Sequence, residues 1–207
     1  MPKSLADSHQ SRTNRERTET TRLALIDAAR ALFVSKGYGE TSTPEIAVAA
    51  GITRGALYHH FVDKRDLFRQ VLVREAETVA ADIEAATPAQ LTPREALLQG
   101  STAYLNAMAA PGRTRLLLIE GPAVLGLEEI MAIDEATSAN SLRRGLEKAR
   151  PGKAQVSLAA LARLLSATFD RAALEIDAGA DPEEIHSAMR WLLEQALGPE
   201  PRRRSPV

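Results

Sequence analysis

Apolar side chains recur along most of this chain at intervals of three and four residues, the spacing that gathers them on one face of an α-helix. The first such stretch begins near Thr20 and stops at Gly37, and its apolar face carries Leu25, Ala29, Leu32 and Phe33. Residues 1–18 are polar and charged and show no such period, so we predict a flexible basic arm there.

Signals for new helices follow in quick succession. Ser42 and Glu45 have the spacing of a capping box, in which each side chain binds the other residue's backbone N–H. Thr53 is placed to cap a third helix, and Asp63 a fourth that runs to about Ala86. The sequence therefore predicts two short helices joined by a turn, followed by a long helix.

A second helical region follows the break at Thr87 and Pro88. Proline and glycine separate its segments, and the predicted helices cover residues 93–110, 113–119, 122–149, 154–179 and 182–197. We predict an all-α chain with two domains and a disordered tail, at residues 19–79, 80–199 and 200–207.

The composition agrees with an all-α fold and removes several classes of function. The 207 residues include 36 Ala and 26 Leu, both strong helix formers, and aromatic residues make up only 4%. Without cysteine the chain forms no disulfide and no thiolate metal site. Since no nucleophile or phosphate-binding motif occurs either, we predict no catalytic residues, no metal and no cofactor.

Charge and apolar content also bear on where the protein works. We find no secretory leader and no apolar run long enough to span a membrane, which predicts a cytoplasmic protein. Residues 1–74 hold 12 Lys and Arg against 8 Asp and Glu, a net charge of +4, and the remainder carries −5. This division indicates a polyanionic partner for the front half, although an imbalance of this size also arises by chance.

The two short helices have the composition of a helix-turn-helix. Small and apolar residues at Ile46 and Ala47 let the helices pack closely, and Gly51 allows the sharp turn. The second helix turns Leu57 inward, and its other faces present donors and flat rings around two small residues: Arg54, Gly55, Ala56, Tyr58, His59 and His60. Such a face suits a helix in the major groove of DNA.

The segments TSTPEIA at residues 41–47 and GITRGALYHHF at residues 51–61, followed by Lys64, resemble the TetR family of bacterial transcription regulators. The resemblance implies an N-terminal three-helix domain, with its helix-turn-helix at residues 42–61, that binds double-stranded operator DNA. Arg54 and His59 are the implied base readers. The full set of implied DNA contacts is Ser42, Thr43, Thr53, Arg54, Gly55, Ala56, Tyr58, His59, His60 and Lys64.

Some of these residues also have a plainer interpretation. Tyr58 is placed to pack against the preceding helix. His59 and His60 are neighbours, so they point about 100° apart on a helix and do not share a metal ion. The arginines of residues 12–22 either enter a minor groove or lie in a solvated arm whose glutamates dilute their charge.

The acidic back half is similar to the ligand-binding and dimerisation domain of the same family. Tyr104 and Met108 share a helix face, and we predict that they border an effector pocket together with Leu117 and Glu120. Alternatively, Tyr104 and Met108 belong to the core, and Glu120 pairs with an arginine such as Arg113 or Arg115.

Two apolar stripes predict a homodimer, because family members pair their last two long helices across a two-fold axis. The stripes carry Leu161, Leu165, Phe169, Ile185, Met189 and Leu192. The alternative is that both stripes fill the protomer's own core. The resemblance as a whole implies a dimeric repressor that binds a palindromic operator and is released by a small molecule. The alternatives are an activator, or a helical small-molecule-binding protein whose DNA binding is not relieved by ligand.

Overall fold

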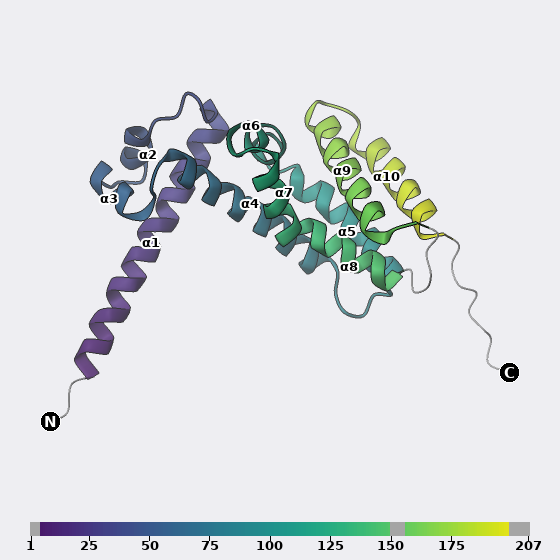
Figure 1. The fold of residues 1–207 in the computed structure, drawn as a ribbon, viewed down its shortest axis with the longest axis horizontal. Helices are drawn as coiled ribbons and strands as arrows, with labels where there is room; N and C mark the ends of the chain where they lie inside the picture. The colour runs from purple at the N-terminus through teal and green to yellow at the C-terminus, as the bar shows by residue number, and fades with distance from the viewer. Residues whose placement is uncertain (1–4, 150–155, 199–207) are drawn as a thin grey trace.

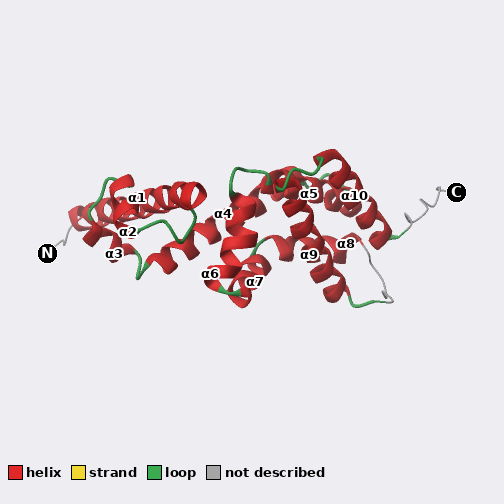
Figure 2. Cartoon of the chain, turned by 90° about the horizontal axis from the view of Figure 1, so that it is seen from above, coloured by secondary structure: helices red, strands yellow, loops and turns green. Residues whose placement is uncertain are grey.

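The computed structural model describes residues 5–149 and 156–198, and every regular element in those ranges is a helix (Figures 1 and 2). The elements are α1 (Leu5–Lys36), α2 (Thr43–Ala49), α3 (Arg54–His60), α4 (Lys64–Ala86), α5 (Pro93–Met108), the π-helix η1 (Arg115–Glu120), α6 (Gly121–Leu125), α7 (Leu127–Ala136), α8 (Ser138–Ala149), α9 (Leu158–Asp177) and α10 (Pro182–Leu197). The all-α prediction is confirmed.

The helices form two groups that share α4. Helices α2 and α3 lie with the C-terminal half of α1 at one end of the molecule, and α5 and α8 to α10 lie at the other (Figure 1). Helix α4 runs from the first group into the second, and the N-terminal half of α1 projects away from the body. A single continuous helix therefore connects the two ends.

The smaller group has a core built around aromatic rings. Phe33 of α1 and Phe68 of α4 are fully buried and meet edge to face, with ring centroids 5.0 Å apart. Tyr38, in the turn after α1, packs on Phe68 at 4.9 Å. Leu116 of η1 and Leu125 of α6 complete this core, so elements of the second half of the chain cover the first.

The second core lies between α4, α5, α8, α9 and α10. Its most buried members include Val79 of α4, Leu146 of α8 and Leu193 of α10, each at most 1% exposed. Leu117 of η1 packs against both cores, so the π-helix is a second connection between them.

The predicted helix starts are confirmed. Ser42 accepts a hydrogen bond from the backbone N–H of Glu45, whose carboxylate in turn accepts from the backbone N–H of Ser42 at 3.0 Å. Thr53 caps α3 through the N–H of Ala56, and Asp63 caps α4. In each case the side chain satisfies a backbone donor that the first turn leaves unpaired.

The prediction of a flexible arm over residues 1–18 was wrong for residues 5–18, which belong to α1. The sequence holds neither proline nor glycine between Pro2 and Gly37, so nothing stops the helix from extending backwards from its packed part. Each residue added to the existing helix then forms one more backbone hydrogen bond, and the unfavourable nucleation step is not repeated. The predicted tail at residues 200–207 lies outside the described residues.

The helix predicted over residues 122–149 is three helices, and the short one predicted over 113–119 is the π-helix. Gly126 ends α6 with a φ of +87°, a left-handed conformation that glycine adopts without strain. Thr137 ends α7 with φ −126° and ψ −104°, outside the helical region. Two bends of the backbone thus divide a segment whose apolar period alone suggested continuity.

Candidate nucleic-acid interface and ligand cavity

Helices α2 and α3 form a compact helix-turn-helix held from inside. The N–H of Ile52 donates to the carbonyl of Ala47 at 2.9 Å, and Gly51 turns the chain with a φ of +69°. Ile46 of α2 and Leu57 of α3 are fully buried. Because Leu57 occupies the inner face of α3, the remaining faces of this helix are presented outward.

The outward residues are those that the sequence predicted. Thr53, Arg54, Gly55 and His59 are exposed, whereas Ala56 and His60 are half-buried. A Cβ built on Gly55 would meet nothing closer than the Thr53 hydroxyl at 3.9 Å. Packing within the described chain therefore does not require glycine at this position. Because glycine has no side chain, the helix surface is not raised here between the polar side chains on either side.

Three side chains form a polar chain on this surface. The Tyr58 hydroxyl lies 3.1 Å from the Thr43 hydroxyl, and the Arg54 guanidinium lies 5.6 Å from the centre of the Tyr58 ring. Hydrogen bonds from Thr43 and Arg54 lower the pKa of Tyr58. Tyr58 is 43% exposed, so it touches α2 through its hydroxyl and leaves much of its ring in solvent.

Lys64 and Ser42 have structural partners as well. The Lys64 ammonium donates to the carbonyls of Tyr38 and Thr41, at 2.8 and 2.9 Å, and lies 4.2 Å from the centre of the Tyr38 ring. An ammonium has three donors, so one remains after these two bonds. The Ser42 hydroxyl lies in the capping box described above and donates to Glu45 at 2.9 Å.

A buried ionic cluster joins the two groups of helices. Glu75 of α4 is 5% exposed and accepts bonds from Arg30 of α1, at 2.8 and 3.0 Å, and from Arg113 at 2.9 Å. Burial raises the pKa of Glu75, but the hydrogen bonds from the two arginines outweigh it and hold the pKa below its ordinary value. The cluster therefore fixes α1, α4 and the segment before η1 to one another.

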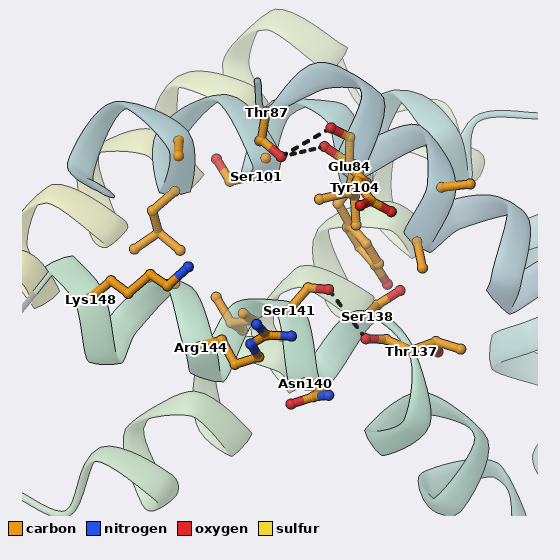
Figure 3. Close-up of a pocket in the computed structure, with 18 of the residues that line it drawn as sticks. Glu84, Thr87, Ser101, Tyr104, Thr137, Ser138, Asn140, Ser141, Arg144 and Lys148 are labelled. Atoms are coloured by element: carbon orange, nitrogen blue, oxygen red, sulfur yellow. Dashed lines mark hydrogen bonds between the residues drawn. The ribbon is translucent and has the colours of Figure 1, made fainter. Parts of the chain in front are cut away.

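A cavity of about 820 Å³ opens between α4, α5 and α8, with residues of α9 in its wall (Figure 3). Its apolar lining includes Ile83, Leu97 and Phe169. Hydroxyls of Ser101, Tyr104 and Ser138 and the side chains of Arg144 and Lys148 supply its polar lining. A volume of this size suits a small organic ligand, since such pockets span about 300–1,000 Å³.

Of the four residues predicted to border an effector pocket, only Tyr104 lines this cavity. Met108 is 2% exposed in the core and borders a separate recess of about 220 Å³, and Leu117 lies between the two cores. The prediction that Glu120 borders the pocket was wrong. Its carboxylate is 2.7 Å from the Arg115 guanidinium and accepts from the backbone N–H of Tyr38 at 3.0 Å, so it holds the turn after α1.

Sequence reasoning missed two half-buried carboxylates behind the cavity wall. Asp170 of α9 accepts a bond from the Tyr104 hydroxyl at 2.7 Å, and Asp134 of α7 accepts from Ser166 at 3.2 Å. Desolvation raises the pKa of Asp170 to about 6 and also raises the pKa of Asp134. The available signal was that Ser166 and Asp170, four residues apart, interrupt the apolar pattern of this helix.

The stripes predicted to form a dimer interface are part of the protomer's own core. Leu165, Phe169 and Met189 are each at most 5% exposed, and the other predicted interface residues, Leu161, Ile185 and Leu192, are half-buried and pack against the same core. The periodicity marked the inward faces of α9 and α10. Their outward faces instead expose Leu164 at 69% and Trp191 at 61%.

Two family models match the chain. Residues 25–71 match the bacterial regulatory proteins of the tetR family, and residues 94–198 match the tetracyclin repressor-like C-terminal domain. The second match alone spans half of the chain. The protein belongs to the TetR family.

Other TetR-family proteins agree with this assignment. The transcriptional regulator AcrR of Shigella flexneri is 47% identical over 60 residues, 29% of this chain and 28% of AcrR. The transcriptional repressor BepR of Brucella suis is 44% identical over 63 residues, 30% of each chain. The matched segments thus span less than a third of these curated relatives.

A crystal structure extends the likeness along the whole fold. A TetR-family regulator of Pectobacterium atrosepticum superposes with a TM-score of 0.69 at 28% identity, over 91% of this chain and 99% of its own. The protein is thus a helix-turn-helix transcriptional regulator of the TetR family, and all ten predicted DNA contacts lie inside the N-terminal family match. No helix in the described ranges is long and apolar enough to cross a membrane.

Proposed function

We propose that this TetR-family regulator is a repressor that binds a palindromic operator as a dimer and is released when a small molecule enters the cavity. The observation that carries the proposal is the outward face of α3. Its inner face is fixed by the fully buried Leu57, so Arg54 and His59 stand on a rigid helix with their polar atoms in solvent.

On this proposal Arg54 and His59 read base edges, and the residues around them hold the DNA backbone. An arginine that binds guanine through two hydrogen bonds favours the correct base by about 1–3 kcal/mol. Thr43 and Tyr58 already support each other through a 3.1 Å contact and would meet phosphate together. Gly55 and Ala56 let α3 approach the groove closely, and the remaining donor of Lys64 completes the backbone contacts.

The dimer would form across the outward faces of α9 and α10. Leu164 and Trp191 are large apolar residues that stay exposed in the single chain, and a two-fold axis through this surface would bury both. Sedimentation of Leu164→Asp should then show a monomer at concentrations where the parent is a dimer. The control Leu127→Asp changes another leucine, 65% exposed on α7, and should leave the dimer intact.

Release would follow from linkage between the cavity and α4. Ile83 and Glu84 of α4 line the cavity, whereas Leu67 and Leu72 of the same helix lie in the core under the helix-turn-helix. A ligand that prefers a different position of α4 therefore also changes the position of α3. A 100-fold loss of operator affinity needs a differential affinity of about 2.7 kcal/mol.

The DNA-binding step is tested on sites selected from random sequence. Fluorescence anisotropy would compare the parent with Arg54→Ala and with Arg163→Ala, which removes the same charge from an exposed position on α9. Both variants are first shown by sedimentation to have the oligomeric state of the parent. We expect Arg54→Ala to weaken specific binding by about 5- to 150-fold, and the α9 variant to change it less than about twofold. Equal effects of the two variants would refute sequence-specific reading by α3. So would complete displacement of the selected site by unrelated competitor DNA.

Repression is tested separately by transcription in vitro from a promoter that overlaps the selected site. Added protein should lower transcript yield, and the Arg54→Ala variant should require a higher concentration for the same effect. A rise in transcript yield would identify an activator.

A further inference from the structure

Two cations on one face of α8 point into the cavity. Arg144 and Lys148 are four residues apart, so they lie one above the other on the helix surface. Figure 3 shows both side chains reaching from α8 into the space opposite Thr87 and Ser101. Within the described ranges, neither cation forms an ion pair, whereas the adjacent Arg143 binds Glu147 at 2.8 Å.

The packing of α8 keeps these cations at the cavity. A Cβ on Gly145 would lie 2.7 Å from the side chain of Leu97, so only a glycine lets α8 approach α5 this closely. Leu146, the next residue, is fully buried. The helix therefore cannot rotate to carry Arg144 and Lys148 out of the cavity without losing both contacts.

The carboxylates behind the cavity wall do not neutralise this charge. Asp170 and Asp134 stand outside the lining and already accept hydrogen bonds from Tyr104 and Ser166. Each of these bonds satisfies a hydroxyl donor at the wall. Tyr104 and Ser166 thus occupy these two acids, and the fixed positive charge of Arg144 and Lys148 remains.

Acidic residues also line the cavity on the side of α4. Glu77 and Glu84 are exposed there, but neither lies within ion-pair distance of the α8 cations in the described structure. An anionic group between Arg144 and Lys148 would gain charge-assisted hydrogen bonds from both. The apolar wall of Ile83, Leu97 and Phe169 offers the complementary surface for a hydrocarbon body.

We infer that the effector of this cavity is an amphipathic organic acid whose carboxylate binds Arg144 and Lys148 and whose apolar body lies along α4, α5 and α9. The inference rests on the proposed function for its regulatory meaning, but not for the binding itself. A neutral ligand of the same shape would leave the two cations without a counter-charge, and a cationic one would be repelled by them.

Calorimetric titration of the full-length protein without DNA tests the chemistry directly. The probes are three matched series with alkyl and phenylalkyl bodies of increasing length, namely carboxylates, their neutral amides and the corresponding amines. We expect a carboxylate to bind at least about tenfold more tightly than its amide, and amines to bind least. Arg144→Gln and Lys148→Gln should each weaken the carboxylate by about tenfold or more, and both should leave the amide unchanged.

The control is Arg163→Gln, which removes an exposed cation that does not line the cavity and should leave carboxylate binding unchanged. Far-ultraviolet circular dichroism of each variant verifies that the overall helix content is that of the parent. Amides or amines that bind as tightly as the acids, an effect of Arg163→Gln as large as those of the α8 variants, or no binding by any acid would each overturn the inference.

Operator binding then separates this inference from the proposed function. An acid that binds through Arg144 and Lys148 and also releases the selected DNA supports both. An acid that binds in the same way but leaves the DNA complex intact supports the ligand class and refutes release as the mode of regulation.

Discussion

Neutralising the half-buried carboxylate of Asp170 should stabilise the folded protein at neutral pH. Desolvation raises the pKa of Asp170 from 3.8 to about 6, even though the Tyr104 hydroxyl donates to it at 2.7 Å. A tenfold change in a proton-binding constant equals about 1.4 kcal/mol, so the charged form makes folding less favourable by about 3 kcal/mol above both pKa values. Asp170→Asn keeps the shape and an acceptor for Tyr104 but removes the charge.

The direction of the pH dependence follows from proton counting. Because the folded state holds a proton on Asp170 that the unfolded state releases, the free energy of unfolding falls as the pH rises from about 4 to about 6. The raised pKa of Asp134 acts in the same direction. We therefore expect the advantage of Asp170→Asn over the parent to grow by about 2 kcal/mol between about pH 4.5 and about pH 7.5.

Urea unfolding at a fixed protein concentration, followed by circular dichroism, measures this difference at the two pH values. Tyr104→Phe is the matched counterpart, since it removes the donor that stabilises the charged Asp170 and should destabilise the protein more at the higher pH. An Asp170→Asn variant that shows the same stability difference at both pH values would refute the desolvation argument. So would a Tyr104→Phe variant whose loss of stability does not depend on pH.

Substitutions at three further positions test other features by thermal unfolding at a fixed protein concentration. Glu75→Gln should destabilise by about 3–5 kcal/mol, because buried Arg113 loses its carboxylate partner at 2.9 Å and keeps only the more distant, exposed Asp82 at 3.8 Å; a loss below about 1 kcal/mol would contradict the role of the cluster. Gly112→Ala should cost at least about 1 kcal/mol, since φ is +74° and the new Cβ would lie 2.6 Å from Val34; an unchanged melting temperature would contradict this. Ser42→Ala should cost about 1 kcal/mol and Ser42→Thr much less, and equal losses would exclude capping as the reason.

Features set by neighbouring residues could be predicted from the sequence. The caps at Ser42, Thr53 and Asp63 depend on a side chain and a backbone N–H three residues away, so their types and spacing suffice. The outward face of α3 could be predicted for the same reason, because Leu57 defines the inner face of a short helix. The full reach of α1 was missed because a polar segment without a period does not reveal the helix that extends into it.

Features set by distant residues could not be predicted. Glu120 gave no sign of its bond to the N–H of Tyr38, which comes from a turn 82 positions earlier in the chain. The apolar stripes of α9 and α10 showed correctly that these helices bury one face, but periodicity does not say whether the same chain or a second copy covers it. Leu164 and Trp191, outside the strongest stripe, mark the surface that remains.

Because α4 is long, a small tilt of this helix at the cavity produces a large displacement of its other end, near α3. Its 23 residues span about 35 Å at ~1.5 Å per residue, and the cavity touches one end while α3 stands near the other. A tilt of about 5° about the cavity end displaces the far end by about 3 Å, close to the ~3.4 Å between successive base pairs. In the proposed symmetric dimer the two displacements add, so a shift of side-chain size at each ligand would move the two α3 helices out of step with the helical repeat of the DNA.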